Sequence, residues 1–156
     1  MKVLGIDPGF GRCGVAIVEK KNGKEILIDS ACIETSATAP FEARMSTVAD
    51  GCARLIKKHK VDVVVLERLF FNNNQKTAFQ VAETRGAIIY VATKAGLPVF
   101  EYTPGQVKSA TARAGNADKK QVARMLHILL KINKTIRHDD EYDAIAVALT
   151  HLACAR

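Results

Sequence analysis

The sequence predicts an α/β protein in which a mixed five-stranded sheet is flanked by helices. In the first third of its 156 residues, three short strand-like segments are separated by turn residues, as in an antiparallel meander. In the remaining two thirds, apolar strand-like runs alternate with segments of helical periodicity. This order of elements favours a sheet of mixed strand direction that is covered by helices.

The N-terminal part is predicted to form three strands. Residues 3–6 are a short apolar strand, and the sequence Pro-Gly-Phe-Gly at 8–11 is a turn. A second strand covers residues 14–19 and a third covers residues 25–34. Between these two strands, Asn22-Gly23 is a strong signal for a tight hairpin turn.

Helices and strands alternate in the rest of the chain. Pro40 opens a helix whose apolar residues recur every three or four positions as far as Ile56. The β-branched run at 61–66 is typical of a strand that is buried on both faces. The later elements are a helix at 75–95 that ends at Gly96, a strand at 99–102, a helix that begins at Thr103-Pro104, and helices at 119–131 and 139–153.

The predicted order of elements is β-β-β-α-β-α-β-α-α-α, which suits the RNase H-like fold. We find no internal repeat, low-complexity tract or linker in the sequence. We therefore predict a single RNase H-like domain over residues 1–156, of a size typical for one compact domain.

The composition indicates in which cellular compartment the protein works. Hydrophobic residues make up 48% of the chain, which is enough for a sizeable core. No stretch approaches the roughly 18 uninterrupted apolar residues that a membrane span needs. The N-terminus reaches the charged residue Asp7 too early for a signal peptide. We expect a soluble, cytoplasmic protein without a membrane partner.

The net charge of +7 is concentrated in one segment. Residues 102–137 contain eight basic residues and one acidic residue, Asp118, whereas the rest of the chain has 15 of each sign. Such a segment is either a solvated helical face or a surface that binds a polyanion such as nucleic acid. A dense acidic group at 139–143 follows directly, which points to chemistry on nucleic acid. The eight basic residues are Lys108, Arg113, Lys119, Lys120, Arg124, Lys131, Lys134 and Arg137.

Four acidic residues are candidates for catalysis. Asp7 and Glu67 each end an apolar strand, and they would meet if the first and fourth strands are parallel neighbours. Asp140 and Asp143 are three positions apart at a helix start, so they project from one face. Taken singly, each has a structural explanation as a turn residue, a strand end or a favourable charge at a helix N-terminus.

Together, the four carboxylates indicate a metal site. Acidic groups within a few ångströms of one another repel and raise one another's pKa values, and a divalent cation removes this repulsion. Their hard oxygen ligands suit Mg²⁺, with Mn²⁺ as a substitute. Two such ions roughly 4 Å apart can activate a water and stabilise the leaving oxygen of a phosphodiester, so we expect two ions per site.

Six short stretches of the sequence carry a further signal. They are Gly5-Ile6-Asp7-Pro8-Gly9, Glu67-Arg68-Leu69-Phe70-Phe71-Asn72, Glu83-Thr84-Arg85-Gly86, Tyr102-Thr103-Pro104-Gly105-Gln106-Val107-Lys108, Gly115-Asn116-Ala117-Asp118-Lys119-Lys120-Gln121-Val122 and Asp140-Glu141-Tyr142-Asp143-Ala144-Ile145-Ala146. In this order, and over nearly the whole chain, they resemble the RuvC family of Holliday-junction resolvases.

The resemblance implies a homodimeric endonuclease that nicks two opposed strands of a four-way DNA junction, leaving 5′-phosphate and 3′-hydroxyl ends. It implies a branch-migration helicase as a further partner. By matching position, Asp7, Glu67, Asp140 and Asp143 would be the metal-binding catalytic acids. Lys108 and Lys119 would be basic residues close to the scissile strand, and Phe70 an aromatic residue near the junction crossover.

One departure from the family's pattern affects the acids. The family commonly has small residues between the last two aspartates, whereas this chain has Glu141-Tyr142. Asp139 or Glu141 could therefore share the metal role of Asp140, and His138 is a further candidate ligand.

Other residues are candidates for DNA contact. We include Phe71, Lys76, Arg113 and Lys120, since exposed aromatic side chains stack on unpaired bases and basic ones bind phosphates. The helix at 75–95 has more small and apolar residues than one buried stripe needs, which makes it the candidate dimer surface. Three alternative functions remain open: a nuclease acting on structured RNA or RNA–DNA hybrid, an actin-like small-molecule kinase, and a non-catalytic junction-binding protein.

Overall fold

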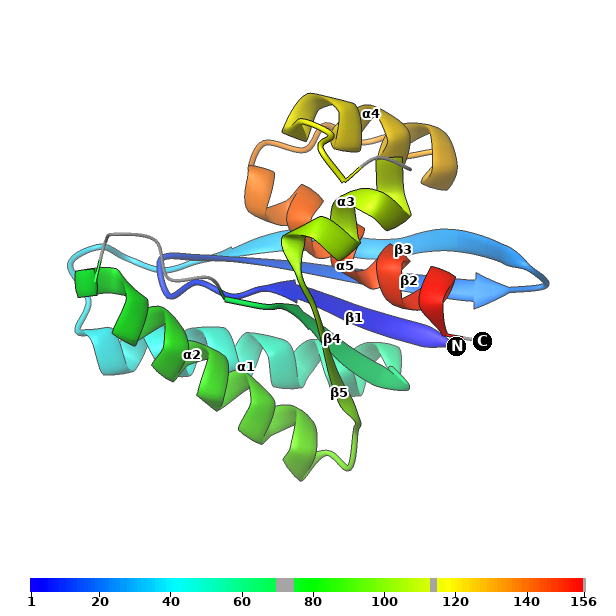
Figure 1. Ribbon diagram of the computed structural model, residues 1–156. Coiled ribbons are helices and arrows are strands. Elements are labelled where there is room, and N and C mark those ends of the chain that lie inside the picture. Colours follow the sequence, from blue (N-terminus) through cyan, green and yellow to red (C-terminus); the bar gives the residue numbers. More distant parts are fainter. Residues whose placement is uncertain (70–74, 113–114, 156) are drawn as a thin grey trace.

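The computed structural model describes residues 1–69, 75–112 and 115–155 and contains one five-stranded sheet of order β3-β2-β1-β4-β5. Strands β1, β2 and β3 form an antiparallel meander, whereas β1, β4 and β5 are parallel (Figure 1). The mixed five-stranded sheet predicted from the sequence is therefore confirmed. The strands are β1 (Lys2–Asp7), β2 (Arg12–Lys21), β3 (Lys24–Glu34), β4 (Val63–Glu67) and β5 (Val99–Tyr102).

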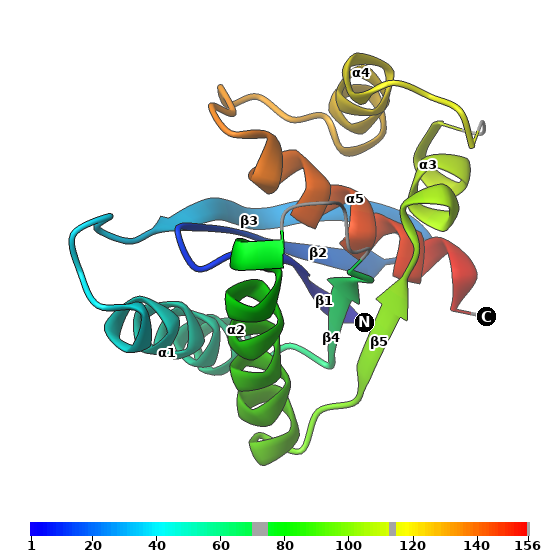
Figure 2. The same cartoon turned by 60° about the vertical axis from the view of Figure 1, so that its left-hand side comes forward.

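Helices cover both faces of the sheet. Helices α1 and α2 pack together on one face, and α5 lies across the other, with α3 and α4 beyond it (Figures 1 and 2). No helix in the described part of the chain is long and apolar enough to cross a membrane. The helices are α1 (Phe41–His59), α2 (Gln75–Lys94), α3 (Pro104–Ala112), α4 (Lys119–Leu130) and α5 (Asp139–Cys154).

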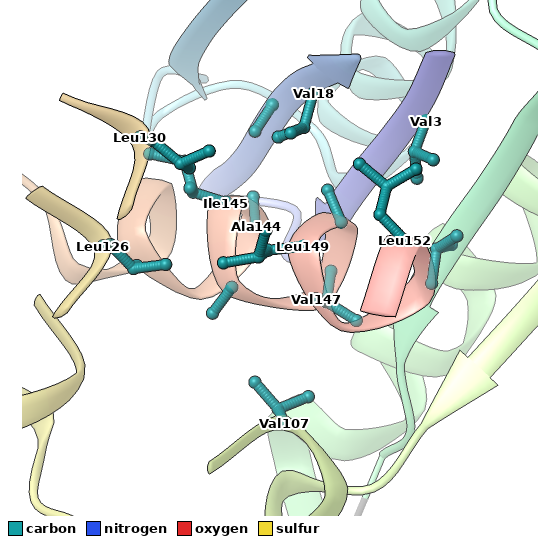
Figure 3. Packing of buried hydrophobic residues seen from close by; sticks show 14 of the residues in the cluster. Val3, Val18, Val107, Leu126, Leu130, Ala144, Ile145, Val147, Leu149 and Leu152 are labelled. Carbon is teal, nitrogen blue, oxygen red and sulfur yellow. The ribbon is translucent and has the colours of Figure 1, made fainter. Parts of the chain in front are cut away.

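The central strands are buried on both faces because their side chains alternate between two apolar cores. Leu4 and Leu66 face the core beneath α1 and α2, which includes Ile88. Val3 and Val65 face the core around α5. Figure 3 shows how α3 and α4 complete this second core with a set of aliphatic side chains, Val107, Leu126 and Leu130. The β-branched run at 61–66 thus forms a doubly covered strand, as its composition predicted.

The local signals in the sequence form the expected turns and caps. Asn22 and Gly23 both have positive φ angles, of 52° and 75°, as a tight hairpin turn requires. Helix α4 begins with a capping box in which Asp118 accepts from the Gln121 backbone N–H and the Gln121 side chain accepts from that of Asp118. The elements differ from the predicted ranges mainly at their ends, where β2 is longer at both ends.

Two glycines allow α5 to lie directly on the sheet. A Cβ atom at Gly5 would overlap the backbone oxygen of Ala144, and one at Gly14 would overlap that of Asp140. Any larger residue at either position would push the helix away from β1 and β2. The start of α5 is therefore held close to the end of β1, where Asp7 lies.

Candidate active site

Asp7 and Glu67 lie at the carboxyl ends of adjacent parallel strands. Strand β1 pairs with β4 in the register Ile6↔Leu66, so the two acids occupy the next matching positions. Side chains alternate along a strand. Because Val3 and Val65 face α5, Asp7 and Glu67 point to the same side. The sequence predicts that Asp7 and Glu67 meet if the first and fourth strands are parallel neighbours. Strands β1 and β4 are paired in this way.

Helix α5 brings two more carboxylates to this end of the sheet. Asp140 and Asp143 lie in its first two turns, and both are partly buried, with 26% and 32% of their side chains exposed. The Asp143 carboxylate lies 3.4 Å from the ammonium of Lys119, which begins helix α4. The same ammonium lies 3.6 Å from Asp139. Lys119 therefore stands at the edge of the acidic group.

The carboxylates raise one another's pKa values. Burial and the charges of Asp143, Glu67 and Asp140, in that order, raise the pKa of Asp7 to about 8, against a smaller opposing effect of Lys119. Burial and the Asp143 charge also raise the pKa of Glu67, which Lys119 and Lys108 oppose. Burial raises the pKa of Asp143 despite its bond to Lys119. Four acids from three separate elements thus form one electrostatic group.

Lys119 keeps its charge beside these acids. Burial alone would lower the pKa of Lys119, but Asp143 and Asp139 outweigh burial and raise it. Lys119 therefore remains an ammonium at neutral pH. Both Lys108 and Lys119 act on the Glu67 carboxylate, so the two predicted lysines lie near the same acid.

A cleft of about 610 Å³ opens beside the acids, between α5 and the two helices above the sheet. Its lining includes the acids Glu67, Asp139 and Asp143 as well as three lysines. The rest of the lining is mostly apolar and comes from α3, α4 and α5. The lysines are Lys108, Lys119 and Lys120, and the other lining residues are Pro104, Val107, Val122, Ala123, Tyr142 and Ala146. The cleft therefore combines acidic and basic groups in a space open to a DNA strand.

The donor chemistry fits a divalent metal. Every acidic side chain in the group offers hard carboxylate oxygens, which divalent cations such as Mg²⁺ prefer. Burial and the neighbouring carboxylates raise the pKa of Asp7, and a bound cation would offset both effects. Within residues 1–69, 75–112 and 115–155, however, no three acidic, histidine or cysteine side chains converge closely enough to enclose an ion. The acids influence one another's pKa values at longer range, and their carboxylates would have to move closer together to bind one cation.

The three alternative ligands near Asp140, namely Glu141, His138 and Asp139, have different partners in the structure. Glu141 is buried and points away from the acids, accepting a hydrogen bond of 2.7 Å from Ser30. His138 lies 2.7 Å from Glu34, on the sheet side. Asp139 is exposed but lines the cleft and pairs with Lys119. Of the three alternatives, Glu141 fits a metal role least, because its carboxylate is bonded to Ser30 and Lys134.

Several predicted DNA-binding residues cannot be placed. Phe70, Phe71 and Arg113 lie outside the described residues. Lys76 belongs to the first turn of α2, but its side chain is likewise outside the described part. Lys108, Lys119 and Lys120 are placed, and all three line the cleft.

Arg12 lies beside the acidic group, although it was not identified as a site residue from the sequence. Its guanidinium lies 3.3 Å from Asp140 and 3.1 Å from a ring nitrogen of His138. The signal was present in the sequence, because Arg12 follows the glycine-rich turn after Asp7 and opens the next strand of the hairpin. Asp140 is thus partly neutralised by a side chain from β2, unlike Asp7.

The sheet order and the carboxylates at the ends of β1 and β4 define a nuclease of the RNase H-like class. A family model described as "Crossover junction endodeoxyribonuclease RuvC" matches residues 3–151. The chain belongs to the RuvC family of crossover junction endodeoxyribonucleases, the Holliday junction resolvases.

Individual relatives support this assignment over the full chain. The chain is 42% identical over 151 residues to RuvC of Petrotoga mobilis, a match that covers 97% of this chain and 93% of the relative. It is 39% identical over 151 residues to RuvC of Brevibacillus brevis, covering 97% and 91%. A structure described as T. thermophilus RuvC in complex with Holliday junction substrate superposes with a TM-score of 0.94 at 34% identity, covering 100% and 95%.

The family assignment confirms the predicted fold, enzyme class and function. It decides against the kinase, the hybrid-cleaving nuclease and the non-catalytic binding protein. The family is generally metal-dependent, in agreement with the chemistry of the acidic group.

Proposed function

We propose that residues 1–156 act as one catalytic domain that hydrolyses phosphodiesters at the crossover of a four-way DNA junction, with Asp7, Glu67, Asp143 and Asp140 as metal-binding acids. The observation that carries this proposal is the cleft in which Glu67 and Asp143 face Lys108 and Lys119. The relative from T. thermophilus was solved with a Holliday junction substrate, and its fold matches along the whole chain. We further propose that the enzyme works in the bacterial cytoplasm.

The acids would hold Mg²⁺, or Mn²⁺ in its place, as one or two ions. Such an ion, when bound, activates water for attack on phosphorus and stabilises the leaving oxygen. The water oxygen bonds to phosphorus, the bond to O3′ breaks, and the 3′-oxygen leaves as a hydroxyl. The products are a 5′-phosphate and a 3′-hydroxyl.

The lysines have a separate role in the reaction. A phosphodiester gains negative charge in its transition state, and fixed ammonium groups offset that charge. Lys119 is two-thirds exposed and already paired with Asp143 at 3.4 Å, so it can contact both the acid and an incoming phosphate. Lys108 also lines the cleft, and its charge acts on Glu67. The two lysines thus hold the scissile phosphate between them and the acids.

The basic surface beyond the cleft would hold the junction arms. Of the eight basic residues counted in the sequence, six are exposed on or beside α4: Lys119, Lys120, Arg124, Lys131, Lys134 and Arg137. Phosphate contacts by such residues release counterions, so binding should weaken steeply with added salt. Phe70 and Phe71 remain our candidates for stacking at the crossover, with Lys76 and Arg113 as further phosphate contacts.

Paired nicks require two sites, and we propose a homodimer formed through α2. Phe79 and Tyr90 on this helix expose 72% and 65% of their surface. They are eleven positions apart, which places them on one face at about 100° per residue. A two-fold dimer would present equivalent sites to the two equivalent strands of an open junction. A branch-migration helicase remains a proposed partner.

A cleavage assay tests the proposal directly. A labelled mobile four-way junction is incubated with the protein, with and without Mg²⁺, beside a linear duplex and an RNA–DNA hybrid of the same sequence. We expect paired nicks only in the junction and only with the metal. The Asp7→Asn variant should bind the junction as the unchanged protein does and leave it uncut. Undiminished nicking by this variant would refute the metal-site assignment.

A further inference from the structure

The start of α5 carries two side chains that are bonded to partners on neighbouring elements and not to the acids. They are Glu141 and Tyr142, which lie between Asp140 and Asp143 in the helix. Each is bonded to a different neighbouring element. Their position within the acidic turn suggests a role in aiming the carboxylates.

Glu141 is anchored to strand β3 and to the segment before α5. Its side chain accepts a hydrogen bond of 2.7 Å from the Ser30 hydroxyl and lies 2.5 Å from the Lys134 ammonium. The same ammonium donates to the backbone oxygen of Ser30. Only 7% of Glu141 is exposed. A buried carboxylate with a charged and a neutral donor has one favoured geometry, because any other leaves these groups unpaired.

Tyr142 is anchored to helix α4 on another side. Its hydroxyl lies 2.8 Å from Nε2 of His127, and Nδ1 of the same ring lies 3.1 Å from the backbone oxygen of Ile132. Since a carbonyl oxygen only accepts, Nδ1 donates to Ile132, and Nε2 is available to accept from the Tyr142 hydroxyl. The imidazole is thereby held in place, and Tyr142 is bonded to a fixed partner.

The first turn of α5 contacts the sheet differently from the rest of the helix. From Ala144 onward, α5 packs on the sheet through apolar side chains. At its first turn, the close contact with the sheet is that of Gly14 with the backbone of Asp140. This glycine contact sets the distance of the first turn from β2, and the side chains of that turn must fix its orientation. At a side-chain radius of about 6 Å, a rotation of about 10° moves a carboxylate by about 1 Å. Displacements of that size cost catalysis about a hundredfold.

We propose that Glu141 and Tyr142 are positioning residues that fix the rotation of α5 and so aim Asp140 and Asp143 at Asp7. The bonds to Ser30 and Lys134 act on one side of the helix and the bond to His127 on another. This inference rests on the proposed metal-binding role of the acids. It adds that Glu141 and Tyr142 set the orientation of the Asp140 and Asp143 side chains.

Two conservative variants test the inference without emptying the core. Tyr142→Phe removes one hydroxyl and keeps the ring, and Glu141→Gln keeps an acceptor for Ser30 while removing the charge. Tyr102→Phe is a matched control, since it removes a comparable bond of 3.0 Å to His151 in the last turn of α5. Glu42→Gln is a matched control on the exposed surface of α1.

Three quantities are measured for each variant. They are Mn²⁺ affinity of the free protein by electron paramagnetic resonance, single-turnover cleavage of the junction, and junction affinity in EDTA. We expect each positioning variant to bind Mn²⁺ several-fold more weakly and to cleave about tenfold more slowly, and the double variant about a hundredfold. Junction affinity should stay within twofold, and both controls should match the unchanged protein.

The outcomes separate this inference from the proposed function. If Asp143→Asn is inactive but the positioning variants match their controls, the inference is wrong and the site assignment stands. If Asp143→Asn cleaves normally, the proposed function itself fails. Equal losses of Mn²⁺ affinity, cleavage and junction affinity would indicate general damage and would also overturn the inference.

Discussion

Replacing Asp7 by asparagine should stabilise the metal-free protein at neutral pH. The pKa of Asp7 is raised from 3.8 to about 8, first by burial and then by Asp143, Glu67 and Asp140. The folded state therefore binds a proton that the unfolded state releases above pH 4. Stability that is present below pH 4 is lost progressively as the pH rises to 8. An asparagine side chain has no charge to lose and removes this penalty.

The size of the effect follows from the shift. Each pKa unit corresponds to about 1.4 kcal/mol, so at pH 7 the unfolded state gains up to about 4 kcal/mol from ionising this group. Water and mobile counter-ions at a partly exposed site reduce this free-energy penalty. We therefore expect Asp7→Asn to raise the free energy of unfolding by about 1–3 kcal/mol. For a chain of this length that is a rise in Tm of about 3–9 °C.

Urea denaturation in EDTA at pH 5, 6, 7 and 8 measures the effect. The difference between Asp7→Asn and the unchanged protein should grow with pH, whereas Asp50→Asn, on the exposed surface of α1, should show no such trend. Addition of Mg²⁺ should stabilise the unchanged protein more than the variant, because ligand binding favours the folded state. A variant that is less stable at every pH, or a difference that does not vary with pH, would refute the reasoning.

Three further predictions concern the surroundings of the acids. Lys108→Ala and Lys119→Ala should each slow single-turnover cleavage about a hundredfold while junction affinity in EDTA changes only a few-fold; an equal loss of both would contradict a role in the reaction. Arg12→Ala should raise Mn²⁺ affinity by up to about fivefold, as expected if a surface ion pair worth at most about 1 kcal/mol competes for Asp140; unchanged affinity would show that Arg12 does not compete. Gly14→Ala should lower the free energy of unfolding by about 1–3 kcal/mol, measured by urea denaturation, because its Cβ would overlap the backbone of α5; an unchanged midpoint would mean that α5 can shift freely.

Short patterns of the sequence predicted much of the fold. The β-branched run at 61–66 predicted a strand covered on both faces, and Val63, Val64, Val65 and Leu66 are all nearly inaccessible. The Asn22-Gly23 signal predicted the hairpin between β2 and β3, and both residues have the positive φ angles that it needs. These signals are local, since a turn or a buried strand is specified by the residues that form it.

The candidate site was legible only in part. Asp7 and Glu67 stood out because each ends an apolar strand, and their meeting depended on a parallel pairing that the structure contains. The sequence could not decide which of Asp140, Glu141 and Asp139 points to the metal site, because neighbouring helix positions differ by only about 100° in direction. The deciding partners, Ser30 and Arg12, lie more than a hundred residues away in the chain.

The sequence by itself determined the family, the alternation of strands and helices, the acids that end the strands and the segment that carries the positive charge. These depend on residue identity and on spacing along the chain. Only the tertiary structure decided that Glu141 turns toward β3, that Arg12 partly neutralises Asp140, and that Lys108 and Lys119 line one cleft with Glu67 and Asp143. Each of these depends on the distance between side chains from separate elements, and that distance is set by how the helices pack on the sheet.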